Sequence, residues 1–161
     1  IHGLDTHLER FKAKNDDYSD ILLKALGDRL AEAFAERLHA HVRENVWGYA
    51  GIEHLTNQEL IREKYTGIRP APGYPACPDH SLKPILFRML GGTGEEGPAG
   101  ITLTDNFAML PTSAVSGFYF AHRDSDYFGV ARIGRDQLEE YAARRGVSLE
   151  QAERWLRPNL D

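Results

Sequence analysis

The chain has 161 residues, of which 42% are hydrophobic and 27% charged, and its formal net charge is −5. This length and composition are typical of one globular domain with a core of its own. Acidic residues outnumber basic ones, 24 against 19, which argues against a nucleic-acid partner because phosphate binding needs clustered Lys and Arg.

The sequence shows neither a membrane segment nor a secretion signal. No run approaches the roughly 18 apolar residues that span a bilayer, and residues 1–20 lack the pattern of a signal peptide. We therefore expect no membrane partner. Cys77 is the one cysteine, so no internal disulfide can form and a cytoplasmic location is expected. The opening IHGLD lacks a Met, and we interpret it as a cut from something longer.

Residues 16–45 predict a long helix. Large apolar side chains recur there every four residues, which places them on one helix face. About 28 residues would make a helix roughly 40 Å long. The residues of this apolar face are Leu22, Leu26, Leu30, Phe34, Leu38 and Val42.

The other side of this helix carries a row of carboxylates. Asp28, Glu32 and Glu36 follow one another at intervals of four residues, beside Arg29 and Arg37. One interpretation is a solvated face with local ion pairs. The alternative is a docking edge for a partner.

A second, short helix is expected within residues 55–67, where Thr56 and Glu59 have the spacing of a capping box and Gly67 supplies the stop. A stiff, exposed loop follows in residues 69–80, RPAPGYPACPDH, which has four prolines within nine residues. Each proline lacks a backbone N–H and has a fixed φ, so this segment suits neither a helix nor a sheet interior.

This proline-rich loop has the character of a recognition segment. Its backbone is ordered in advance and can face a ligand at little further entropic cost. Arg69 can clamp a carboxylate with two parallel hydrogen bonds, and Tyr74 can lay its ring on a cation or another ring. The alternative is a stiff connector with an arginine on its surface.

The remaining segments complete an α+β pattern. Residues 80–90 predict a short helix capped by Asp79, and the glycine-rich residues 91–100 predict a flexible loop. Segments rich in β-branched and aromatic residues predict three strands, at residues 101–110, 113–120 and 127–134. The last two strands would form a hairpin around AHRDSD. A helix pair then ends the chain, with a stop at Gly146 and a cap at Ser148. We therefore expect a long N-terminal helix, a small antiparallel sheet with a hairpin, and a C-terminal helix pair.

No familiar catalytic or metal-binding motif is present. The seven histidines are scattered without the spacing of a metal site, so no metal is expected. Cys77 and His80 could form a thiolate–imidazole pair, and a thiol packed under the loop is the alternative. The sequence has no nucleophile elbow, phosphate-binding loop or dinucleotide fingerprint, so we assign no catalytic residue.

Several segments resemble one family in the same order along the chain. The loop RPAPGYPACPDH is similar to the signature of the reactivation domain of cobalamin-dependent methionine synthases. Further similar segments are DRLAEAFAERLH, IREKYTGIRPAPGYPACPDH, LTDNFAMLPTSAVSGFYFAHRDSDYFGVARIGRDQLEEYA and RWLRPNL. The resemblance covers residues 3–161, which would be the C-terminal part of that domain.

The resemblance implies a role in methyl transfer. In this family the domain binds S-adenosylmethionine, which remethylates the cobalamin after it has oxidised to cob(II)alamin, with an electron from a flavodoxin-type protein. The implied partners are that reductant and the neighbouring domain of the same enzyme that holds the cobalamin. Displacement at an activated methyl group needs position more than an acid or a base, which agrees with the absence of a catalytic motif.

The resemblance also implies ligand contacts at particular residues. The family pattern places them at Arg69, Ala71, Tyr74, Glu63, Tyr127 and Phe128. Arg69 would bind the methionine carboxylate, and Glu63 would add a polar contact from the preceding helix. Tyr127 and Phe128 would bring the predicted hairpin to the loop, so that both line one groove, and ordinary core filling is their alternative role.

The long helix would then be where the cobalamin-binding domain docks, with Asp28 and Glu32 as the contact residues. The family pattern also has an acidic residue for the ligand's amino group, in a stretch that residues 1–15 do not match. The lack of one charge-assisted bond would weaken binding roughly 10- to 150-fold. A docking module with an incomplete ligand site is therefore the second functional hypothesis.

Overall fold

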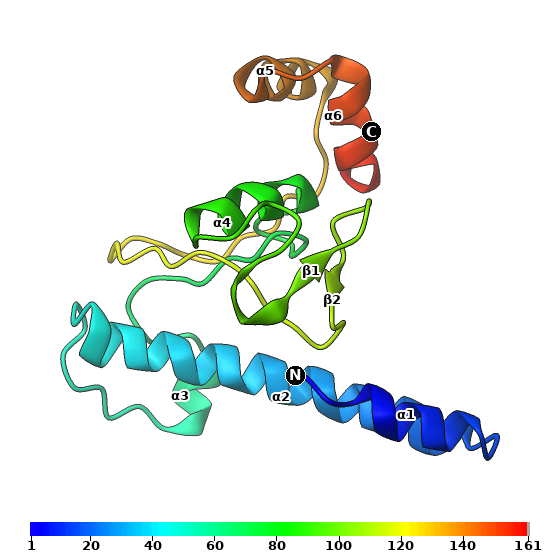
Figure 1. Cartoon of the computed structure of the whole chain (residues 1–161). Coiled ribbons are helices and arrows are strands. Elements are labelled where there is room, and N and C mark those ends of the chain that lie inside the picture. Colours follow the sequence, from blue (N-terminus) through cyan, green and yellow to red (C-terminus); the bar gives the residue numbers. More distant parts are fainter. Residues whose placement is uncertain (161) are drawn as a thin grey trace.

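The computed structural model describes residues 1–160, which form three tiers (Figure 1). The tier drawn at the bottom is α2 (Asp17–His41), which a π-helical turn (Val42–Val46) continues. The short α1 (Asp5–Lys12) lies beside the start of α2, and α3 (Asn57–Ile61) lies near its C-terminal end. The predicted helix over residues 16–45 is therefore confirmed.

The other two tiers lie on one side of α2. The middle tier holds α4 (Lys83–Met89) and the strands β1 (Thr102–Leu103) and β2 (Met109–Leu110). The upper tier is the pair α5 (Arg135–Arg145) and α6 (Leu149–Leu156). This arrangement confirms the expected α+β class. No helix in the described part of the chain is both long and apolar enough to cross a membrane.

Local capping explains where the helices begin. Asp16 Oδ1 accepts a hydrogen bond from the Ser19 amide at 3.0 Å at the start of α2. The capping box of Thr56 and Glu59 opens α3 as predicted. That helix nevertheless ends at Ile61, well before the predicted stop at Gly67.

The apolar face of α2 is bare in this chain. Such a stripe normally faces a core, yet Leu30 and Phe34 are 59% and 64% exposed. The side of α2 that meets the rest of the chain instead carries small or polar residues, and the buried ones are Asp20, Gly27, Ala31 and His39. At Gly27 a Cβ would come within 2.7 Å of Ser113 Oγ, so glycine is what permits this close approach.

The sheet is smaller than predicted and lies elsewhere. β1 and β2 pair antiparallel, with Thr102 opposite Leu110, and both lie inside the segment 101–110 that was expected to be a single strand. In the described structure, residues 113–120 and 127–134 do not pair with each other, so the predicted hairpin is wrong.

These two segments bond instead to the proline-rich loop and to Ile68, which directly precedes it. Proline has no N–H to donate, but its carbonyl still accepts. The backbone donor–acceptor pairs are Phe118 to Pro70 at 2.9 Å, Phe120 to Ile68 at 3.0 Å and Val130 to Pro75 at 2.8 Å. The loop therefore lies between the segments that were expected to be neighbours.

The upper tier has a small core of its own. Its buried residues are Leu138, Ala142, Ala152 and Leu156. Gly146 ends α5 in the left-handed conformation, with a φ of +66°, and Ser148 caps α6 by accepting from the Gln151 amide at 3.2 Å. The predicted C-terminal helix pair is thus confirmed.

Candidate functional site

The proline-rich loop is a compact turn. The Gly73 amide donates to the Cys77 carbonyl at 2.8 Å, and the Cys77 amide donates to the Tyr74 carbonyl at 2.9 Å. Gly73 has a φ of +102°, and a Cβ there would lie 2.2 Å from the His80 ring, so this position requires glycine. Residues 70–72 are buried, which corrects the expectation of a wholly exposed segment.

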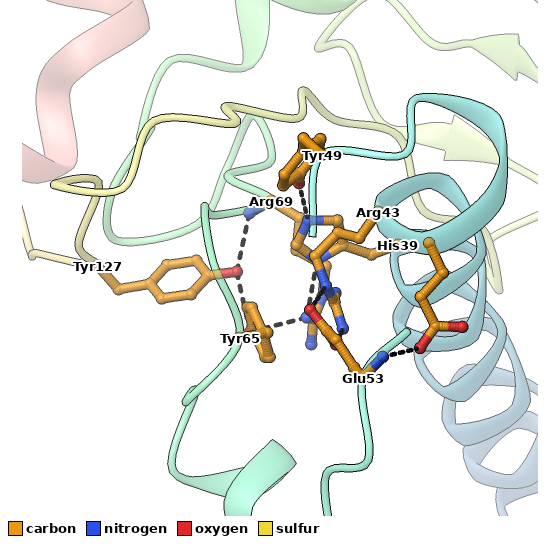
Figure 2. Close-up of polar contacts among 8 residues, drawn as sticks. His39, Arg43, Tyr49, Glu53, Tyr65, Arg69 and Tyr127 are labelled. Carbon is orange, nitrogen blue, oxygen red and sulfur yellow. Dashed lines mark hydrogen bonds and ion pairs between the residues drawn. The ribbon is translucent and has the colours of Figure 1, made fainter. Parts of the chain in front are cut away.

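Neutral groups hold the guanidinium of Arg69 (Figure 2). Its NH1 donates to Tyr65 Oη at 2.8 Å and lies 3.5 Å from His39 Nδ1. Among the described residues, no carboxylate pairs with Arg69, and its Nε and NH2 have no hydrogen-bond partner. A half-buried arginine without a counter-charge can bind an anionic ligand through a charge-assisted bidentate contact.

Tyr127 reaches the same place from the far side of the loop. Its Oη accepts from the Arg69 backbone amide at 2.8 Å and lies 3.3 Å from Tyr65 Oη. Figure 2 shows both contacts meeting at the Tyr127 hydroxyl. The structure thus brings together Arg69 and Tyr127, which lie 58 residues apart in the sequence.

A buried ion pair lies behind this cluster. Arg43, which is 1% exposed, donates from Nε to Glu53 Oε1 at 2.8 Å and from NH2 to Glu53 Oε2 at 2.5 Å. The Arg43 guanidinium also lies 4.4 Å from the centroid of the Tyr65 ring. Because Glu53 neutralises Arg43, the cation of this cluster that is left without a carboxylate partner among the described residues is Arg69.

The protonation states of the neighbours follow from their surroundings. Burial, with the nearby charges of Arg43 and Arg69, lowers the pKa of His39 to about 4. Burial is also the largest cause that raises the pKa of Tyr65. Both groups are therefore neutral at pH 7, and neither cancels the charge of Arg69.

A cavity of about 480 Å³ opens beside Arg69. It is bounded by α2, by the start of the proline-rich loop and by residues 113–119. Among the described residues that line it, Arg69 is the one Arg, Lys, Asp or Glu, and Ala71 lies close by. Phe34 and Leu38 of α2 contribute to its largely apolar wall. Such a space suits a ligand that joins a carboxylate to a large, mainly non-polar body.

The carboxylate row of α2 ties other segments to this helix. Tyr74 Oη donates to the Glu32 carboxylate, and this hydrogen bond, together with burial, raises the pKa of Tyr74 to about 12. Ser113 Oγ donates to Asp28 Oδ1 at 2.7 Å. These contacts within the chain were not expected from the sequence, and docking at Asp28 and Glu32 stays a prediction.

Four of the predicted ligand contacts, at Glu63, Tyr74, Tyr127 and Phe128, are not among the described residues that line the cavity. Glu63 lies beyond the end of α3 with a left-handed φ of +56°, and not on a helix as expected. Phe128 is 62% exposed, so it does not fill a core in this chain. Ligand contacts at these four residues, as at Arg69 and Ala71, stay predictions.

Cys77 does not form the thiolate–imidazole pair that was considered, because no hydrogen bond joins it to His80. The Nδ1 of His80 lies instead 2.7 Å from Nζ of the buried Lys83. Burial, with the nearby charge of Asp79, raises the pKa of Cys77, which favours an unreactive thiol at neutral pH. Among residues 1–160, no group of three or more His, Cys, Asp or Glu is placed to hold a metal ion.

Sequence reasoning missed the residues that surround Arg69. They are His39, Arg43, Glu53 and Tyr65. His39 and Arg43 are one helical turn apart at the end of the predicted long helix, and this pairing of a histidine with an arginine was the signal that the sequence offered. Nothing in the sequence, however, shows which segment that helix end meets.

The family described as the vitamin B12 dependent methionine synthase activation domain matches residues 1–146. The chain belongs to this family. That result confirms the resemblance found in the proline-rich loop and its neighbouring segments.

A solved structure is similar to this activation-domain chain over nearly its whole length. It is the crystal structure of the MetH reactivation domain bound to AdoHcy, with 55% sequence identity and a TM-score of 0.86. The match covers 97% of this chain and 47% of that one, so this chain spans about half the length of the solved chain.

Proposed function

We propose that this chain binds S-adenosylmethionine and presents its methyl group for the reductive remethylation of cob(II)alamin. The observation that carries the proposal is the Arg69 guanidinium, which stands at the edge of an apolar cavity without a carboxylate partner among the described residues. Membership of the activation-domain family and the similarity to a reactivation domain that binds S-adenosylhomocysteine support it.

The Arg69 end of the cavity fits the carboxylate of such a ligand. S-adenosylmethionine is an amino acid joined through a positively charged sulfur to adenosine. Arg69 would bind its carboxylate through the Nε and NH2 that are left open, and Ala71 and the apolar wall would accept its non-polar surface. Further contacts are proposed at Tyr74, Glu63, Tyr127 and Phe128.

The chain's own task would be to bind and orient this ligand. When bound, S-adenosylmethionine supplies a methyl group that its positive sulfur already activates, and a reduced cobalamin on a neighbouring domain supplies the nucleophile. We propose that this cobalamin-binding domain docks along α2 near Asp28 and Glu32, and that a flavodoxin-type protein delivers the electron. The chain would thus act as one part of a cytoplasmic methyltransferase of methionine biosynthesis.

Calorimetric titration of the chain with S-adenosylmethionine tests the proposal. Arg69→Ala should weaken binding roughly 10- to 150-fold, because a charge-assisted contact is lost. Arg144→Ala on the distant α5 is the matched control and should bind as the wild type does. A folded wild-type chain that gives no heat at millimolar ligand would sink the proposal.

The second candidate function is a docking module whose ligand site is incomplete. The observation that favours it is the bare apolar face of α2, with Leu30 and Phe34 more than half exposed. Its partner would be the cobalamin-binding domain or the flavodoxin-type protein. Complex formation with either partner, by a chain that binds no S-adenosylmethionine, would select this alternative.

A further inference from the structure

One end of the Arg69 guanidinium already has hydrogen-bond partners within the chain, and one edge has none among the described residues. NH1 is occupied by Tyr65 Oη at 2.8 Å and faces His39 Nδ1 at 3.5 Å. Nε and NH2 have no partner among the described residues. A carboxylate bound side-on to a guanidinium uses two parallel N–H donors, and the Nε and NH2 donors form such an edge.

His39 is rigidly placed for its contact with Arg69. Its side chain is fully buried, at 0% exposure. Its ring stacks on Tyr119 at 4.8 Å between centroids with 11° between the planes, and meets the Tyr65 ring edge-on at 5.3 Å. On its other side, Nε2 lies 3.3 Å from Tyr49 Oη. Aromatic contacts on two sides leave the imidazole little freedom to rotate.

The partners of the imidazole assign its tautomer. A guanidinium can only donate, so Nδ1, which faces Arg69, must accept. The proton of the neutral ring then belongs on Nε2, where it is donated to Tyr49 Oη. A doubly protonated ring would point an N–H at the Arg69 guanidinium, which opposes protonation here.

The position of Tyr65 is equally constrained by its contacts. It is buried, and the Arg43 guanidinium, itself paired with Glu53, covers its ring at 4.4 Å. Its hydroxyl accepts from Arg69 NH1, which leaves its own proton for Tyr127 Oη at 3.3 Å. Arg69 is thus fixed by neutral acceptors. A carboxylate at either place would hold the arginine more strongly but would compete with an anionic ligand.

We propose that Tyr65 and His39 are positioning residues that occupy NH1 of Arg69 and so direct its open edge toward the carboxylate of the ligand. This inference rests on the proposed function, since it specifies how the ligand's carboxylate is selected. Tyr65 and His39 themselves act through Arg69 and need not touch the ligand.

Two ligands that differ only in the carboxylate can distinguish a positioning role of Tyr65 from a general structural role. S-adenosylmethionine carries the carboxylate, and decarboxylated S-adenosylmethionine lacks only that group. Tyr65→Phe keeps the ring over Arg43 and removes the acceptor, so it should weaken binding of S-adenosylmethionine about 10-fold. Its effect on the decarboxylated ligand should stay below about twofold, and in an Arg69→Ala background it should have no further effect. Tyr18→Phe, at an exposed tyrosine of α2, is the matched control.

Variants of His39 provide a second, independent test. His39→Phe keeps an aromatic ring and removes the Nδ1 acceptor, so it should reproduce the carboxylate-selective loss. His39→Asn, which can place an oxygen near the position of Nδ1, should recover part of that loss. Without any ligand, the nitrogen chemical shifts of the His39 ring at pH 7 should report the tautomer protonated at Nε2.

The outcomes are distinguishable. If the wild type binds neither ligand, the proposed function falls and this inference falls with it. If the wild type binds but Tyr65→Phe and His39→Phe weaken both ligands equally, or add to Arg69→Ala, the positioning role alone is overturned. A His39 ring protonated at Nδ1 overturns its part in the same way, and if Tyr65→Phe does not fold, the His39 variants and the tautomer decide.

Discussion

The charge of His39 is set by its immediate neighbours. Its ring is fully buried and lies near two guanidinium groups, and these surroundings lower its pKa from the ordinary 6.5 to about 4. A histidine in this condition behaves as a fixed neutral acceptor across the physiological pH range, and not as a switch.

This shift predicts a loss of stability in acid. The unfolded chain takes up a proton at His39 near pH 6.5, whereas the folded chain resists protonation until about pH 4. The contribution of His39 to the unfolding free energy is therefore constant above pH 6.5 and falls as the pH drops toward 4, by about 3 kcal/mol over the whole interval. Urea unfolding at several pH values measures this, and His39→Phe should show a shallower fall. Equal slopes for the two proteins would contradict it.

At the scale of elements, α2 presents two faces of opposite character. Its small and polar residues pack against the chain, while its large apolar residues are bare. The carboxylates Asp28 and Glu32 lie at the boundary and bond to Ser113 and Tyr74. The helix is therefore held through its small and polar side, by close approach at Gly27, by hydrogen bonds and by the ring packing of His39.

Substitution on the two faces of α2 should have opposite results. Leu26→Glu with Leu30→Glu alters side chains that are already exposed, so the unfolding free energy should change by less than about 1 kcal/mol. The same change should reduce fluorescence of a dye that binds apolar surface. Ala31→Glu is the matched comparison, because it buries a charge on the packed face and should destabilise the chain strongly. Thermal unfolding and dye titration measure both effects, and equal destabilisation by the two changes would refute the assignment of faces.

The elements that could be predicted from the sequence are those with local signals. The period of α2, the capping residues of α3 and α6, and the stop at Gly146 act within a few residues of themselves. The pairing of the proline-rich loop with residues 118–130 could not be predicted, because its hydrogen bonds use proline carbonyls and partners far away in sequence.

The same limit applies to the candidate site. Arg69, Ala71 and Tyr127 could be named from the sequence because they lie in segments that resemble the family. His39 and Tyr65 were not, because their contacts with Arg69 depend on how the end of α2 meets the loop. The sequence analysis placed Glu63 on a helix because the left-handed turn that follows α3 lacks a glycine, the residue that normally signals such a turn.

At the scale of the whole molecule, few polar contacts join the upper tier to the middle one. Tyr141 Oη donates to the Asp79 carboxylate, and Arg145 NH2 donates to Ser81 Oγ at 3.0 Å. The α5–α6 pair has its own core, so it can keep its internal packing when this junction loosens.

Tyr141→Phe should therefore loosen the junction without unfolding the pair. Asp79 keeps its bonds from Ser81, so we expect a cost of about 1–2 kcal/mol. Hydrogen exchange should quicken in residues 79–82 and 127–134 and stay slow around Leu138 and Ala152. Tyr18→Phe serves as the control. Uniform acceleration through α5 and α6 would show that the pair depends on the junction.

The bridge between Ile68 and Phe120 joins positions 52 residues apart. Closing so long a span costs entropy before any contact rewards it, so we expect this closure late in folding. Arg69 is the next residue along the chain, and its backbone amide donates to Tyr127 Oη, so this part of the site depends on the same long-range closure. A metabolite bound there would stabilise the folded state, because it binds only that state. The unfolding free energy would rise by about 1.4 kcal/mol for each tenfold rise in the metabolite's concentration above the dissociation constant.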